Sequence, residues 1–259
     1  MLITSSSNER VKRIKKLIKS SRERKNQGVY VVEGIRMVRE IPADILEEIY
    51  VSEDSRYRYE DFLKNVPDGV IYEVKSQVFD SMSDTGSPQG IMALAKIRQY
   101  ELEDVFGDKP FILIIEKLQD PGNLGTILRT AEAAGVTGIV MSSDSVDIYN
   151  PKVVRSTMGS IFRMPVYVTD DLPGQIDILK GRNVTIYGAH LKGYTFFDRD
   201  FSIPCGFLIG NEGNGLSDKV SAKADVLLRI PMLGKVESLN AATSTAVISY
   251  EVLRQRKFS

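Results

Sequence analysis

The stretch Phe111-Ile-Leu-Ile-Ile-Glu-Lys-Leu-Gln-Asp-Pro-Gly-Asn-Leu-Gly-Thr-Ile-Leu-Arg129 decides the fold of the C-terminal part of this chain. It opens with five consecutive apolar residues, three of them β-branched, a pattern typical of a parallel strand covered on both faces. Asp120-Pro-Gly122 predicts a turn. A helix follows, with an apolar stripe at Leu124, Ile127, Leu128 and Ala131. Strand, turn and helix in this order indicate an α/β domain with a parallel sheet.

The rest of the C-terminal region repeats this alternation. Short apolar runs predict further strands at 137–141, 165–168, 184–189, 206–210 and 225–230. A last helix is expected from about 239 to 256, where apolar residues recur at spacings of three and four. We therefore assign 110–259 to one α/β domain.

The N-terminal region has a different pattern. Apolar residues at helical spacing begin at Val11, and strands are expected at 29–32, 48–51, 70–74 and 90–95. These elements predict a second, small α/β domain over 1–98. Residues 99–109 are acidic with little periodicity, and we interpret them as the linker.

Composition narrows the class of protein. The 259 residues include 42% hydrophobic and 26% charged residues, which are ordinary values for a globular protein. Apolar runs are too short for a membrane span, and the polar, basic start does not resemble a secretory signal. The single cysteine, Cys205, excludes an intrachain disulfide and a cysteine-rich metal site. We therefore expect a cytoplasmic protein without membrane or metal partners.

Positive charge is concentrated in one segment although the net charge is zero. Residues 9–25 hold nine Lys or Arg against Glu9 and Glu23, a local charge of +7. This asymmetry favours a phosphate-binding surface, and a solvated helix face is the alternative.

Three glycine-containing motifs follow apolar runs. In Asn123-Leu-Gly-Thr-Ile-Leu-Arg129, Arg129 is predicted opposite the apolar stripe, and Asn123 is a candidate helix cap. In Ile209-Gly-Asn-Glu-Gly-Asn-Gly-Leu216, three glycines permit close backbone approach to a ligand, but their spacing and late position do not match a dinucleotide fingerprint. In Ile230-Pro-Met-Leu-Gly-Lys-Val-Glu-Ser-Leu-Asn240, Ser238 is a natural helix cap and Asn240 is expected in the first helical turn.

Together these motifs resemble those of the SpoU (TrmH-like) family of RNA ribose 2′-O-methyltransferases, in the SPOUT superfamily. The segment 150–165 and the stretch Val31-Val-Glu-Gly-Ile-Arg36 extend the resemblance, the latter to an L30e-like RNA-binding domain. The resemblance implies a trefoil-knotted parallel-sheet domain. It also implies S-adenosylmethionine as cofactor, and a homodimer whose subunits complete each other's active sites.

The resemblance also assigns roles to individual residues. Those carried over as catalytic or substrate-positioning are Asn123, Arg129, Glu212, Ser238 and Asn240. The cofactor would be held around Ala189, Gly210, Asn211, Gly215, Ile230, Met232 and Leu239. Candidate RNA contacts, chosen for their charge, are Arg10, Lys12, Arg13, Lys16, Arg22, Arg24, Arg36 and Arg155.

Arginine is an unfavourable general base because it stays protonated in proteins. We therefore expect Arg129 to bind a phosphate bidentately and orient the ribose, with Asn123 fixing its guanidinium. The lone histidine, His190, matches no catalytic position of the family, and we interpret it as accessory or structural.

The expected substrate is structured RNA, with ribosomal RNA of the 23S type favoured because an L30e-like domain is typical of rRNA-directed members. A tRNA substrate stays open. The alternatives are a non-catalytic RNA-binding or ribosome-assembly factor and another kind of nucleotide-dependent enzyme. The five polar residues of the motifs argue against the first, and the missing phosphate-loop fingerprints argue against the second.

Overall fold

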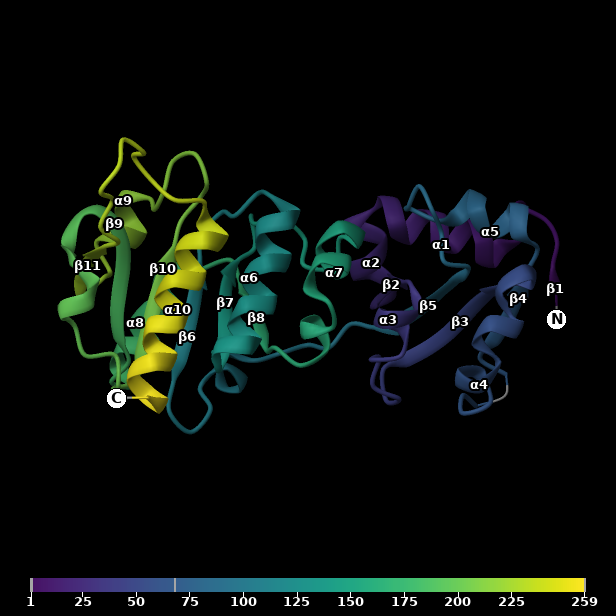
Figure 1. Ribbon diagram of the computed structural model, residues 1–259, viewed down its shortest axis with the longest axis horizontal. Helices are drawn as coiled ribbons and strands as arrows, with labels where there is room; N and C mark the ends of the chain where they lie inside the picture. Colours follow the sequence, from purple (N-terminus) through teal and green to yellow (C-terminus); the bar gives the residue numbers. More distant parts are fainter. Residues whose placement is uncertain (1, 68, 259) are drawn as a thin grey trace. The chain divides into compact units, whose positions relative to one another are not determined.

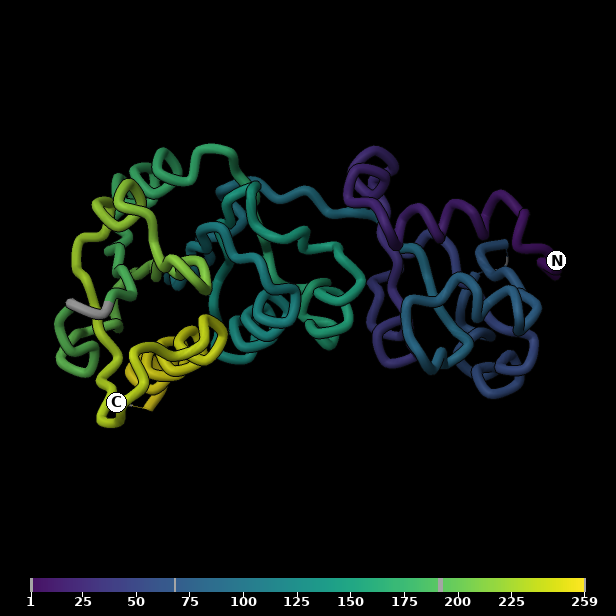
Figure 2. The backbone as a smooth tube through the Cα atoms, turned by 90° about the horizontal axis from the view of Figure 1, so that it is seen from above, coloured from purple at the N-terminus to yellow at the C-terminus, as the bar shows by residue number. Residues whose placement is uncertain are grey.

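The structure is a computed structural model that describes residues 2–67 and 69–258, except for the side chains of 191 and 192. The chain divides into two compact units (Figure 1, Figure 2). Unit 1 comprises the residues up to Arg98 together with 147–162, and unit 2 comprises 99–146 and 163–259. Residues 147–162 therefore belong to unit 1 although both of their sequence neighbours belong to unit 2.

Unit 1 is built on a mixed sheet. Its described strands run in the order β1-β4-β3-β5-β2, with β5 antiparallel to β2 and β3. The strands are β1 (Leu2–Ile3), β2 (Val29–Glu33), β3 (Leu46–Ser52), β4 (Ile71–Val74) and β5 (Ile91–Lys96). Its helices are α1 (Glu9–Lys19), α2 (Ser21–Gln27), α3 (Ile35–Val38), α4 (Glu60–Leu63), α5 (Ser76–Met82) and α7 (Pro151–Thr157). Short 3₁₀ turns lie at η1 (Glu53–Ser55), η2 (Tyr57–Tyr59) and η4 (Ser160–Phe162).

Helix α1 shows how the basic segment folds. Asn8 caps it by accepting a hydrogen bond from the backbone N–H of Arg10. Val11, Ile14 and Leu17 are fully buried against the sheet. Because these residues share one stripe, many of the lysines and arginines lie on the opposite, outer face.

Unit 2 contains a parallel sheet, and its described strands run in the order β11-β9-β10-β6-β7-β8. They are β6 (Phe111–Ile115), β7 (Gly138–Ser142), β8 (Val166–Thr169), β9 (Thr185–Thr195), β10 (Cys205–Ile209) and β11 (Val226–Arg229). The chain moves outward from β6 to β8 and then crosses to the other side of β6. The strand order therefore reverses between β6 and β10, where parallel sheets usually bind their ligands.

The helices of unit 2 are α6 (Pro121–Ala134), α8 (Leu172–Gly181), α9 (Asp218–Ser221) and α10 (Ala241–Lys257), with 3₁₀ turns η3 (Leu102–Val105) and η5 (Phe196–Asp198). Helices α6 and α10 pack side by side (Figure 1, Figure 2). Helix α8 buries Ile176 and Leu179 in a cluster with Ile112 of β6. None of the described helices is both long and apolar enough to cross a bilayer.

These features confirm the predicted fold class, a parallel-sheet α/β domain with a small N-terminal α/β domain. The trefoil knot stays a prediction. Two segments behave differently from expectation. Residues 99–109 contain η3, and Val105 is fully buried with Ile112 and Val140, so much of the segment interpreted as a linker packs into unit 2. Residues 147–162 pack into unit 1, which no local sequence signal indicated.

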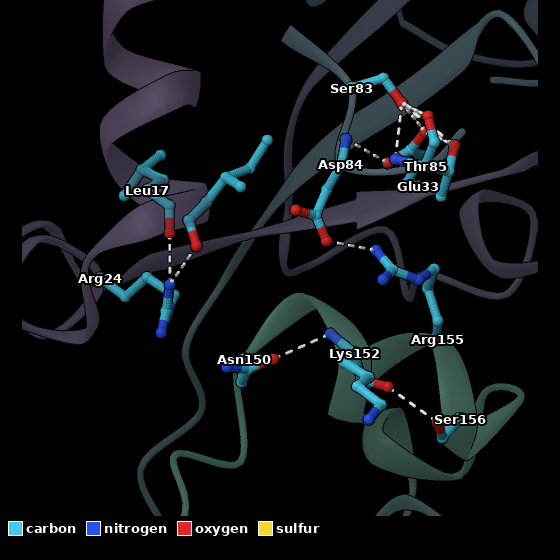
Figure 3. A network of polar contacts seen from close by, with 11 residues as sticks. Leu17, Arg24, Glu33, Ser83, Asp84, Thr85, Asn150, Lys152, Arg155 and Ser156 are labelled. Carbon is cyan, nitrogen blue, oxygen red and sulfur yellow. Dashed lines mark hydrogen bonds and ion pairs between the residues drawn. The ribbon is translucent and has the colours of Figure 1, made fainter. Parts of the chain in front are cut away.

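A buried ion pair holds 147–162 within unit 1. Arg24 is 3% exposed, and its Nη2 donates to Oδ2 of Asp147 over 2.6 Å. Nη1 of the same guanidinium donates to the carbonyls of Leu17 and Ile18 (Figure 3). Tyr149 adds a ring contact with Tyr30, with centroids 4.6 Å apart. Arg24 thus joins the end of α1 to a segment more than a hundred residues further along the chain.

Replacing Asp147 with alanine should destabilise unit 1 by about 3 kcal/mol, because it leaves the buried Arg24 without its counter-charge. Urea denaturation followed by circular dichroism measures this change. Asp61→Ala is the matched control in the same unit, because the Asp61–Lys64 pair is exposed and should contribute less than about 1 kcal/mol. Equal effects of the two substitutions would refute the assigned role of Asp147.

Candidate active site

The candidate site lies where β6 and β10 end side by side. The two strands pair in register from Cys205 opposite Phe111 to Ile209 opposite Ile115. The loops that follow them, 116–120 and 210–217, therefore leave the same edge of the sheet although they are about ninety residues apart. This register brings the first and second motifs together.

Glu212 is the centre of the polar contacts at this edge. Its carboxylate accepts hydrogen bonds from the backbone N–H groups of Gln119 (3.2 Å) and Asp120 (3.0 Å), and from Nδ2 of Asn123 (3.0 Å). Burial acts to raise the pKa of Glu212, but these hydrogen bonds outweigh it and the net pKa is lowered. Glu212 is therefore an ionised acceptor that ties the second motif to the start of α6.

Asn123 links this carboxylate to the third motif. Its Oδ1 accepts a hydrogen bond from Nδ2 of Asn240 over 2.9 Å. Because its Nδ2 donates to Glu212, both ends of the Asn123 amide are engaged and its orientation is fixed. The structure thus joins three of the five proposed catalytic or positioning residues in one chain of contacts.

The two predicted helix caps are wrong. Asp120 caps α6, accepting from the backbone N–H of Asn123 over 2.7 Å, so Asn123 lies inside the first turn. Asn240 caps α10, accepting from the backbone N–H groups of Ala242 and Thr243. Ser238 is exposed in the preceding loop. The sequence contained the signal for the first correction, an Asp directly before a proline at the first helical position.

Arg129 is exposed on α6, as its position opposite the apolar stripe predicted. The expected contact from Asn123 to its guanidinium is not made, because Asn123 is engaged by Glu212 and Asn240. Six residues separate the two along the helix, a rise of about 9 Å that also turns them to different faces. Asn123 therefore organises the loops, and Arg129 faces outward.

The glycine-rich loop after β10 is a tight turn. Asn211 and Gly215 exchange backbone hydrogen bonds of 3.0 and 2.9 Å, and Gly215 has a positive φ of 68°. A Cβ on Gly210 would lie 2.3 Å from the carbonyl carbon of Gly215, so this position requires glycine. The side chain of Asn211 supports the turn by accepting from Gly213 N–H and donating to the Lys117 carbonyl.

An open hollow of about 510 Å³ adjoins the third motif. Ile230, Met232, Leu233 and Val236 supply apolar lining to it. Leu239 and Ala189, the latter in β9, are partly buried. An open hollow with apolar walls suits the adenosyl and sulfonium portions of S-adenosylmethionine. Among the described residues no cluster of His, Cys, Asp and Glu is suited to hold a metal ion.

We expect Gly210→Ala to weaken S-adenosylmethionine binding about tenfold or more, because the added methyl must displace the backbone of residues 215 and 216. Gly213→Ala is the matched control in the same turn, since its Cβ would make only an ordinary 3.5 Å contact with Asn211. Titration calorimetry measures both variants. Unchanged affinity in Gly210→Ala would show that the turn at 210–215 does not contribute to cofactor binding.

The candidate RNA-binding residues lie in unit 1 and differ in their surroundings. Lys12, Lys16, Arg22 and Arg36 are exposed. Arg10 and Arg13 pair with Glu48 and Glu47, and Arg155 pairs with Asp84. Arg24 is corrected, because it is buried against Asp147 and cannot present its charge to RNA. His190, which we interpreted from the sequence as accessory or structural, is exposed in β9.

Comparison with known proteins identifies the class. Residues 110–250 match the SpoU rRNA Methylase family, and residues 8–93 match the MRM3-like substrate binding domain. The chain belongs to the SpoU rRNA methylase family. It is an RNA methyltransferase, and S-adenosylmethionine is its cofactor.

Individual relatives support this over the full length. The 23S rRNA (guanosine(2553)-2′-O)-methyltransferase RlmP of Bacillus subtilis is 33% identical, and the alignment covers 96% of this chain and 98% of the relative. AviRb of Streptomyces viridochromogenes, solved with AdoMet, is 25% identical with a TM-score of 0.88, covering 97% and 99% of the two chains. An AdoMet-bound rRNA methyltransferase of Sinorhizobium meliloti is 27% identical with a TM-score of 0.84, covering 100% and 99%.

Proposed function

We propose that this protein transfers a methyl group to a ribose 2′-oxygen in ribosomal RNA of the 23S type. The observation that carries the proposal is the chain of contacts Glu212–Asn123–Asn240, which joins all three motifs at the strand-order reversal of unit 2. The full-length similarity to a 23S rRNA 2′-O-methyltransferase supports the choice of RNA. A protein that only bound RNA would have no need for this arrangement.

The residues of the site have distinct proposed tasks. The turn at 210–215 and the loop 230–239 hold S-adenosylmethionine, which when bound supplies an electrophilic methyl group. Arg129, exposed and permanently charged, binds the phosphate next to the target ribose through paired N–H donors and so orients the 2′-hydroxyl. Ser238 and Asn240 order the loop that covers the site.

Glu212 has a positioning task in this scheme and is not the proton acceptor. Its carboxylate already accepts two backbone N–H groups and the amide of Asn123. Its lowered pKa makes it a weak base near neutral pH. What it contributes is a fixed distance between the loops of the first and second motifs.

Unit 1 is the proposed RNA-binding part, consistent with its match to a substrate binding domain over residues 8–93. Its exposed cations, among them Lys12, Lys16, Arg22 and Arg36, suit contacts with RNA phosphates. We further infer a homodimer in the cytoplasm, with Arg129 of each subunit available to a shared site because it points away from its own core.

A methyl-transfer assay with radiolabelled S-adenosylmethionine tests the function. The full chain is incubated with a 23S rRNA transcript, a 16S rRNA transcript and bulk tRNA, and labelled nucleotides are mapped as alkali-resistant 2′-O-methyl products. We expect label in 23S rRNA. Label only in tRNA would show that tRNA, and not 23S rRNA, is the substrate. Calorimetric binding of S-adenosylmethionine with no transfer to any RNA would favour a non-catalytic factor.

A further inference from the structure

We propose that a hollow of about 290 Å³ in unit 1 binds one unstacked nucleotide of the RNA substrate, an inference that rests on the proposed function. The residues that carry it are Arg36, Met37, Gln89, Arg155 and Met158. They come from α3, the loop before β5, and α7 with the residue that ends it. The volume lies near the lower end of the range for ligand pockets, about 300 Å³.

Two methionines give the hollow apolar surface. Met37 is buried at 5% exposure, whereas Met158 is 41% exposed at the end of α7. Met158 has a positive φ of 51°, a conformation that the following Gly159, also at positive φ, extends. Thioether side chains are polarisable and pack well against flat rings. A planar nucleobase bound here would therefore pack against the thioether side chains of Met37 and Met158.

Gln89 supplies a fixed polar group beside this surface. Its Oε1 accepts a hydrogen bond from the backbone N–H of Ile35 over 3.1 Å, and its own carbonyl accepts from the hydroxyl of Tyr59 over 2.6 Å. Gly34 allows this approach, because a Cβ there would lie 3.2 Å from Oε1. With Oε1 engaged, the amide offers Nε2 as a donor, which suits an acceptor atom on a base edge.

Two arginines complete the hollow. Arg155 is held in place by Asp84, to which its Nη1 donates over 2.9 Å (Figure 3). Arg36 is exposed and forms no ion pair with any described residue. Guanidinium groups stack on unpaired bases and bind phosphates, and both modes are common in RNA recognition.

The carboxylate of Glu33, also in the wall, is directed elsewhere. It accepts hydrogen bonds from the hydroxyls of Ser83 and Thr85 and from the backbone N–H of Asp84 (Figure 3). Because its lone pairs are engaged in the turn at 83–85, its repulsion of a phosphate is reduced. The hollow therefore combines apolar surface, an oriented amide and two guanidinium groups, one of them paired with Asp84, and this combination suits an unpaired nucleotide.

Two substitutions test the hollow with little risk to folding. Gln89→Glu keeps the acceptor for Ile35 N–H but replaces the Nε2 donor with an oxygen that repels base acceptors and phosphate. We expect it to weaken binding of a 23S rRNA transcript about tenfold. Arg36→Gln should weaken binding about fivefold and reduce the slope of affinity against salt by about one. Arg58→Gln, an exposed arginine of the same unit outside the hollow, is the control with the same charge change.

Filter binding of the full-length variants at fixed salt gives the result, with calorimetry of S-adenosylmethionine as a check that unit 2 is unaffected. Loss of affinity in the first two variants and not in Arg58→Gln supports the proposal. Affinities equal to that of Arg58→Gln in all variants overturn it.

A second measurement separates this inference from the proposed function. If the wild-type protein neither binds nor methylates 23S rRNA, the proposed substrate is wrong. Photo-crosslinking to 4-thiouridine-labelled total cellular RNA then tests whether the hollow binds a nucleotide of another RNA. Adducts on the peptides that contain Met37, Gln89 or Met158 support nucleotide binding there. Adducts confined to other peptides refute it.

Discussion

Arg129→Lys is expected to lower the rate of methyl transfer about a hundredfold while leaving S-adenosylmethionine binding unchanged. Lysine keeps the positive charge but not the planar pair of N–H donors, so a phosphate held in two-point contact would become free to rotate. A small displacement of the 2′-hydroxyl from its line of attack is enough to cost about two orders of magnitude. Single-turnover methylation of 23S rRNA at saturating RNA measures the effect.

The control for this experiment is Arg182→Lys. Arg182 is also exposed in unit 2, but it pairs with Glu103 on the surface and takes no part in the proposed site. Its replacement should leave the rate within about twofold of wild type, as is usual for surface substitutions. Near-normal turnover in Arg129→Lys would refute the two-point contact and leave charge alone as the contribution of Arg129.

The second large effect is expected from Asn123→Asp. The substitution places a carboxylate against Oε1 of Glu212, where Nδ2 of Asn123 now donates over 3.0 Å. Two carboxylates at this distance cannot both stay ionised without strong repulsion, so the loops of the first and second motifs should separate or the pair should retain a proton. We expect methyl transfer at pH 8 to fall about a hundredfold.

The pH dependence of this variant has a defined sign. Repulsion raises the apparent pKa of the pair, so lowering the pH supplies the shared proton and restores one hydrogen bond. The activity of Asn123→Asp relative to wild type should therefore rise as the pH falls from 8 to 6. A ratio that stays constant over this range would contradict the carboxylate pair.

Exchanging both partners offers a rescue. In Asn123→Asp with Glu212→Gln, the amide NH2 of residue 212 takes the place of Oε1 and can donate to the carboxylate of residue 123. Its remaining oxygen still accepts from the backbone N–H of Gln119, whereas the hydrogen bond from Asp120 N–H is lost, so the rescue is partial. We expect the double variant to recover about tenfold over Asn123→Asp, a coupling that independent residues would not show. If the double variant transferred methyl groups no faster than the slower single variant, the Asn123–Glu212 contact would have no role in the reaction.

Local sequence patterns predicted the strands and helices of unit 2 because burial sets the spacing of their apolar residues. Five apolar residues at Phe111–Ile115, three of them β-branched, favour a strand covered on both faces, and they form β6. The stripe on α6 likewise placed Arg129 outside the core. Local signals were weaker at helix starts. Asp120 and Asn240 are the caps, and the caps predicted from the sequence are wrong because Asp, Asn and Ser can each cap a helix and several of them stand near each helix start.

The sequence by itself determined the two α/β regions, the glycine-rich turn after β10, and the outward position of Arg129. These depend on the periodicity and size of neighbouring residues. Only the tertiary structure decided that Glu212 meets Asn123, that Arg24 is buried against Asp147, and that 147–162 belongs to unit 1. Such contacts join residues about ninety or more positions apart, and strand register and the pairing of buried charges, which set them, leave no trace in local spacing.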